Sequence, residues 1–168
     1  MTASGQAGAG GATGTPFQTW DRLDDEALDP PIRPLVRALN ATNWVKTVFS
    51  CGGHPEEPDS VARGRRQAHV DVVVGDERRW REFASRCRRG AAEGVERLRV
   101  RAVRVRVAEG TLGTIPDWLA PALPGRPTRW QYRRLVFEPT PYAIDPDTCR
   151  SALDAALAAA VESLASLA

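Results

Sequence analysis

The chain has 168 residues, of which 42% are hydrophobic, and its formal net charge is +2. A chain of this length can form one ordinary domain with a core of its own. It contains no run of 18 or more uncharged apolar residues, so the sequence predicts no membrane-spanning helix and no membrane partner.

The first 16 residues are mostly Gly, Ala, Ser and Thr. They lack the basic and apolar regions of a signal peptide, and glycine in that amount does not offset its own ordering entropy. We therefore expect a disordered tail over residues 1–16 and a single domain over residues 17–168. Three cysteines, an odd number without an export signal, indicate free thiols and a cytoplasmic protein.

The first half of the domain predicts a helix, two strands and a long loop. Asp29 is expected to cap a short helix that has two prolines at its start and ends near Asn40. Residues 44–50 are rich in β-branched and aromatic side chains, which is typical of a strand. Glycines and prolines make residues 51–67 a long loop, and Ala68–Val74 is predicted to be the second strand.

The middle of the chain predicts a helix and a third strand. Trp80 and Cys87 fall on the apolar face of a helix capped by Asp76, so both are expected in the core. Arginines then alternate with apolar residues over 98–107, as in a half-buried strand. The alternation slips once, and a β-bulge near Ala102 would keep the arginines on one face.

The end of the chain predicts a fourth strand over residues 129–138 and a last helix starting at Asp145. Cys149 lies on the apolar stripe of that helix, so it is expected to be a buried thiol. The small residues of the helix would also permit close packing with a partner, so a homo-oligomer formed through it is one alternative.

The predicted order is therefore α-β-β-α-β-β-α in the α+β class. Short strands that are consecutive in sequence favour a mostly antiparallel four-stranded sheet with the helices on one face. A ferredoxin-like mixed sheet is the alternative.

One segment looks like a functional site: Ser50, Cys51, Gly52, Gly53 and His54, which we call the glycine turn. Two glycines permit positive φ and let backbone N–H groups turn inward as an anion-binding nest. A thiol and an imidazole flank them, as in a nucleophile–base pair. We predict Cys51 and His54 as catalytic residues, with Ser50, Gly52 and Gly53 binding the ligand.

The second strand adds two ligand-binding candidates, because His69 and Asp71 share one of its faces. If the two strands pair in antiparallel fashion, Cys51, His54 and His69 should lie in one pocket. Cys51, His54, His69 and Asp71 also contain the donor types that zinc binds, although no standard zinc spacing is present. A tight turn with a buried thiol remains the structural alternative.

Residues 45–54 read Val-Lys-Thr-Val-Phe-Ser-Cys-Gly-Gly-His. This segment resembles that of small bacterial proteins in which a strand ends in Ser-Cys-x-Gly-His. It is more distantly similar to the Ser-Ser-Cys-Ser-Gly turn of the tRNA wybutosine-synthesis methyltransferase family, through Ser50, Cys51 and one glycine. That family uses S-adenosylmethionine to methylate a tricyclic guanine in tRNA, so the resemblance implies a shared α+β architecture and RNA modification.

Positive charge is concentrated in the middle of the chain. Residues 63–134 hold 18 of the 23 basic residues but only 8 of the 21 acidic residues. The residues predicted to bind nucleic acid on one sheet face are Arg97, Arg99, Arg101, Arg104, Arg106, Arg133 and Arg134. Trp130 and Tyr132 are candidate base-stacking rings. The alternative is a solvated face whose arginines pair with Glu93, Glu96, Glu109 or Glu138.

The sequence thus predicts a small intracellular protein with a ligand or substrate pocket at the glycine turn. The alternatives are an RNA-binding or RNA-modifying protein and a zinc-binding module. Neither the cofactor nor the choice between enzyme and binding protein follows from the sequence. If the arginines and the glycine turn open on the same side of the sheet, a role with RNA or nucleotides is favoured.

Overall fold

The structure is a computed structural model that describes residues 28–98, 102–109, 130–140 and 145–167. Its elements are α1 (Arg33–Asn40), β1 (Val45–Cys51), β2 (Ala68–Val74), α2 (Glu77–Leu98), β3 (Ala102–Glu109), β4 (Gln131–Thr140) and α3 (Pro146–Ala165). The predicted α+β class and element order are confirmed. The predicted tail lies outside the described residues. No helix in the described part of the chain is long and apolar enough to cross a bilayer.

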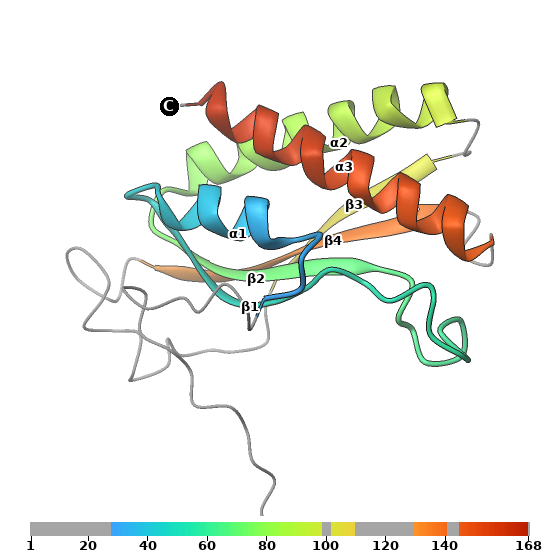
Figure 1. The fold of residues 1–168 in the computed structure, drawn as a ribbon. Coiled ribbons are helices and arrows are strands. Elements are labelled where there is room, and N and C mark those ends of the chain that lie inside the picture. Colours follow the sequence, from blue (N-terminus) through green and yellow to red (C-terminus); the bar gives the residue numbers. More distant parts are fainter. Residues whose placement is uncertain (1–27, 99–101, 110–129, 141–144, 168) are drawn as a thin grey trace, which may run out of the picture.

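The four strands form one sheet in the order β1-β2-β4-β3, and every neighbouring pair is antiparallel. β1 and β3 are the edges of this sheet. All three helices lie on one of its faces (Figure 1). The predicted antiparallel sheet is therefore confirmed for the described strands, and the mixed sheet that was the alternative is not formed there.

Alternation along the central strand β2 defines the two faces of the sheet. Ala68, Val70, Val72 and Val74 are buried in the core under the helices. His69, Asp71 and Val73 point the other way, to the face that no described helix covers, which we call the second face. Val73 belongs to a separate small cluster with Trp130.

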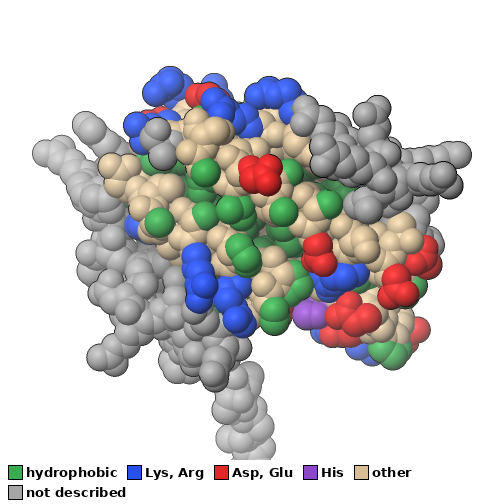
Figure 2. Space-filling model, turned by 45° about the horizontal axis from the view of Figure 1, so that its top comes forward, with side chains coloured by type: hydrophobic (Ala, Val, Ile, Leu, Met, Phe, Trp, Pro, Cys, Tyr) green, Lys and Arg blue, Asp and Glu red, His purple; other side chains and the backbone are tan. Residues whose placement is uncertain are grey.

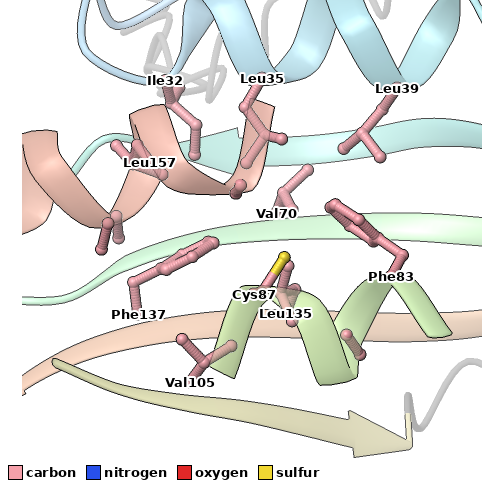
Figure 3. Close-up of a cluster of buried hydrophobic side chains, with 14 of the residues drawn as sticks. Ile32, Leu35, Leu39, Val70, Phe83, Cys87, Val105, Leu135, Phe137 and Leu157 are labelled. Atoms are coloured by element: carbon pink, nitrogen blue, oxygen red, sulfur yellow. The ribbon is translucent and has the colours of Figure 1, made fainter. Parts of the chain in front are cut away.

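The hydrophobic core contains side chains from the sheet and from all three helices. Leu135 and Phe137 of β4 face Phe83 and Cys87 of α2, while Leu157 comes from α3 (Figure 3). The thiols of Cys87 and Cys149 and the ring of Trp80 are buried, as predicted. Burial raises the pKa of Cys87 to about 12, so this thiol contributes packing rather than chemistry.

The boundary between α2 and β3 differs from the prediction. α2 continues to Leu98, so Arg97 belongs to a helix and not to the arginine-bearing strand. Arg99 and Arg101 lie outside the described residues. The β3–β4 register runs without a shift from Ala102 to Glu109, so the predicted bulge is not formed. Residues 91–98 contain good helix formers (Ala, Glu, Arg and Leu), and these extend α2 over the start of the alternating pattern.

The start of α1 also differs from the prediction. Ile32, not Asp29, occupies the N-cap position. The backbone carbonyl of Asp29 accepts from the N–H groups of Ile32 and Arg33, both at 3.2 Å, and its carboxylate points elsewhere. Pro30 and Pro31 have no N–H to donate, which removes donors that a side-chain cap would use. At α3 the prediction is confirmed, because the Asp145 side chain accepts from the Thr148 N–H at 2.9 Å.

Replacing Leu135 by alanine should lower the free energy of unfolding by about 2–5 kcal/mol, because the side chain is fully buried between sheet and helices. Urea denaturation measures this loss. Arg104→Ala, at an exposed position of β3, is the control and should change stability by less than about 0.5 kcal/mol. Equal losses in the two variants would contradict the assignment of the core.

Candidate functional site at the end of strand β1

The pairing of β1 with β2 brings two predicted site residues face to face. The strands are antiparallel, and Cys51 lies directly opposite His69 in the register. Partners in such a ladder project from the same side of the sheet, so both residues lie on the second face. Ser50 pairs with Val70 and therefore lies on the other side. The sequence prediction that these two strand ends meet is confirmed.

The two glycines of the turn are packed closely against the rest of the chain. The Gly52 N–H donates to the Asp29 carboxylate at 2.9 Å, and a Cβ at Gly52 would lie 3.2 Å from the Asp29 Cβ. Gly53 has φ +75°, and a Cβ there would lie 3.0 Å from the Gln67 carbonyl oxygen. The Gly52 N–H was predicted to bind a ligand, but it holds a carboxylate of its own chain.

Arg150 of α3 fixes the turn from the other side. Its guanidinium donates to the Gly52 carbonyl at 3.1 Å and also to the Gly53 carbonyl. The same group lies 3.1 Å from a carboxylate oxygen of Glu56. Arg150 was not predicted as a site residue. It lies in a helix far from the turn in sequence, and the local pattern of a helix carries no sign of such a contact.

The His54 ring lies between carboxylates. Its Nε2 is 3.4 Å from Asp29 Oδ2, and its Nδ1 is 3.6 Å from Glu56 Oε1 and 3.9 Å from Glu57 Oε1. The His54 backbone N–H donates to the Arg65 carbonyl at 2.7 Å, which fixes where the side chain starts. Acidic side chains gather around a histidine at one end of the molecule (Figure 2).

Asp29, Cys51 and His54 form one compact group, which we call the three-residue cluster. One ligand atom from each lies within 4.8 Å of the others. A carboxylate, a thiol and an imidazole are together a donor set for a divalent metal. Asp29 was missed as a site residue, because its place before two prolines indicated only a helix cap.

The other two residues of the predicted zinc donor set, His69 and Asp71, have different partners. His69 lies opposite Cys51 but stacks on Phe49, with ring centroids 5.6 Å apart. Burial lowers the pKa of His69. Asp71 is buried and accepts from Arg134 through both carboxylate oxygens, at 2.5 and 2.7 Å. Of the four predicted zinc ligands, only Cys51 and His54 are in the three-residue cluster, and its carboxylate comes from Asp29 instead of Asp71.

The surroundings of Cys51 do not activate its thiol. Burial raises its pKa above the ordinary value, the Gly53 N–H lowers it, and Asp29 raises it again. A thiol with a raised pKa is mostly protonated at neutral pH, and the thiol is a weaker nucleophile than the thiolate. The catalytic role of Cys51 stays a prediction.

The second face also carries three of the four described strand arginines that were predicted to bind nucleic acid. Arg104 and Arg106 alternate with the buried Val105, so they point to the second face, as Arg134 does. Arg133 points to the helix side, where it pairs with Glu77 at 3.1 Å, so its predicted place on the basic face is wrong. Arg106 pairs with Glu138, one of the partners that the sequence suggested.

The aromatic side chains of this region are also placed differently than expected. Trp130 is buried, and Tyr132 is half-buried. Burial, followed by a hydrogen bond with Asp71, raises the pKa of Tyr132 to about 12. The exposed ring is that of Phe49, with 52% of its surface accessible. Its place two residues before Cys51 was the signal that could have identified it.

Comparison with family models, curated proteins and solved structures finds no match to this chain. The resemblance of residues 45–54 to the tRNA-modifying family therefore stays a prediction.

A left-handed backbone alone costs a residue with a Cβ about 1–2 kcal/mol. Gly53→Ala should destabilise the protein by more than this, because the new Cβ also meets the Gln67 carbonyl. Gly64→Ala is the matched control, since Gly64 has φ +68° but is exposed. Thermal denaturation of both variants measures the difference. Equal losses would show that crowding at the turn is absent.

With a chelator present, alkylation of Cys51 should be slower at neutral pH than that of a free thiol, since its pKa is raised. The rate should rise with pH through a midpoint above the ordinary value of about 8.5. Mass spectrometry of alkylated peptides follows each thiol, and the buried Cys87 and Cys149 should react last. A midpoint below that value would instead identify an activated nucleophile.

Proposed function

We propose that this is a ligand- or substrate-binding protein whose site is the glycine turn, and that its ligand is single-stranded RNA on the second face. One observation carries the proposal: Cys51, Phe49 and Arg134 lie on the same face of one sheet. A face that joins an exposed ring, positioned arginines and a chemically distinctive turn has the components of a single-strand site.

Phe49 supplies the stacking surface. Its ring is one of two large apolar side chains that are exposed in the described residues, and the other is Val61. The ring of Phe49 is tilted by 30° against His69, which limits its motion. Bases stack on such rings with little regard to sequence.

Arg134 supplies a positioned cation. Its Nε and Nη2 are held by Asp71, yet 45% of the side chain is exposed. A guanidinium has five N–H donors, so Arg134 retains donors beyond those that Asp71 uses, and arginine binds phosphate well through such groups. Phe49, Asp71 and Arg134 are successive partners across β1, β2 and β4, so ring and cation are about 10 Å apart at the backbone.

The resemblance of residues 45–54 to an RNA-modifying family points to the same class of ligand. The competing interpretation is a solvated face, because the carboxylates of Asp71 and Glu138 offset two of the arginines. A binding experiment separates the two interpretations.

The test is fluorescence anisotropy with a labelled single-stranded RNA oligonucleotide at several salt concentrations. Affinity should fall as salt rises, since phosphate contacts release counterions. Phe49→Ala should weaken binding about tenfold, which corresponds to one lost stacked base. Arg104→Ala should reduce the slope of the salt dependence by about one.

Val61→Ala is the control, because it removes the other exposed apolar side chain, which lies in a loop and not on a strand, and it should leave affinity unchanged. Double-stranded RNA should bind more weakly, because its bases cannot stack on the ring. Absence of binding at micromolar protein, or equal losses in the Phe49 and Val61 variants, would refute the proposal.

A further inference from the structure

The spacing of the three-residue cluster matches that of ligands around one zinc ion. His54 Nε2 and Asp29 Oδ2 are 3.4 Å apart. Two ligand atoms that are each about 2.1 Å from a tetrahedral zinc are about 3.4 Å from each other. The Cys51 sulfur lies within 4.8 Å of one ligand atom of His54 and one of Asp29.

We propose that Asp29, Cys51 and His54 bind one Zn²⁺ ion. The inference does not depend on RNA binding, because neither Phe49 nor Arg134 belongs to the cluster. It assigns a role to Asp29, which the sequence patterns associated only with a helix start.

The groups behind the cluster have the arrangement of an outer ligand shell. Zinc-bound histidines usually donate their second ring N–H to a carboxylate, which orients the ring and makes it a better ligand. While Nε2 lies beside Asp29, the His54 Nδ1 faces Glu56 and Glu57. Asp29 is itself oriented by the Gly52 N–H, so two of the three ligands are held in place by second contacts.

The backbone that carries the ligands is anchored from several elements. Arg150 of α3 binds the carbonyls of Gly52 and Gly53, between the two ligands of the turn. The Asp29 carbonyl accepts the first N–H groups of α1. Ligands held this way lose little conformational freedom on binding, so the site is preorganised for a metal.

The local charge favours a cation. Three carboxylates, of Asp29, Glu56 and Glu57, lie within 4 Å of the imidazole of His54. Arg150 and Arg65 approach Glu56 and Glu57, which leaves the Asp29 carboxylate beside a thiol that becomes negative as a zinc ligand. A divalent ion balances these two charges.

Three protein ligands leave the fourth position of a tetrahedral zinc for water or a substrate, which is the pattern of catalytic zinc rather than structural zinc. His69, which lies across the ladder from Cys51, is outside the cluster. It therefore serves as an imidazole control near the metal.

The test uses the full chain, stripped with a chelator and titrated with Zn²⁺ or Co²⁺. Native mass spectrometry should find one zinc per chain, and Co²⁺ should give the absorption of a thiolate-bound tetrahedral ion. Asp29→Asn, Cys51→Ser and His54→Gln should each weaken binding by tenfold or more. Asp29→Asn keeps an acceptor for Gly52, so a loss of metal in this variant is separable from a loss of folding.

His69→Gln is the matched control and should bind zinc as the unmodified chain does. Circular dichroism of each metal-free variant confirms that it is folded. No binding by the folded chain at micromolar zinc would overturn the proposal. Stoichiometric binding that survives in Cys51→Ser, or that is lost in His69→Gln, would overturn the ligand set. RNA is absent from these measurements, so their failure is distinct from a failure to bind RNA.

Discussion

The hydrogen bond from the Gly52 N–H to the Asp29 carboxylate is the constraint on which the site depends. It joins the start of α1 to the end of β1, two segments that a long stretch of chain separates. The absence of a side chain at Gly52 permits the approach, since a Cβ would lie 3.2 Å from that of Asp29. With the carboxylate held there, the thiol of Cys51 and the imidazole of His54 both lie within its reach.

The same turn is supported from the helix layer. Arg150 projects from α3 onto the two glycine carbonyls, and Leu153, one turn further along, packs beneath Gly53. Since α3 also forms much of the core against α2 and the sheet, the position of the turn is coupled to the packing of the whole domain. The cluster is thus held by the rigid part of the fold rather than by the loop alone.

On the second face, a buried carboxylate fixes the position of an exposed cation. Asp71 is almost fully buried, so its charge requires a close partner, and Arg134 provides two hydrogen bonds. The guanidinium, however, stays half exposed at the surface. Buried carboxylate and exposed cation together fix the geometry of the face on which the ring of Phe49 also lies.

Local pattern determined much of this protein. The period of two in Ala68–Val74 gave its bounds, and the β1–β2 pairing followed because consecutive strands tend to pair. Apolar spacing likewise placed Trp80, Cys87 and Cys149 in the core. These features depend on residues that are close together in the sequence or on the next strand along the chain. Local sequence patterns can therefore predict them.

Only the tertiary structure decided the make-up of the site. Asp29 and Arg150 reach the turn from opposite ends of the domain, and no local spacing encodes that contact. Arg133 and Arg134 are adjacent in sequence, yet strand alternation sends one to Glu77 under the helices and the other to Asp71 on the second face. The sequence determined which groups were present, whereas their partners depended on how the helices pack on the sheet, because ion pairs and hydrogen bonds act only at short range.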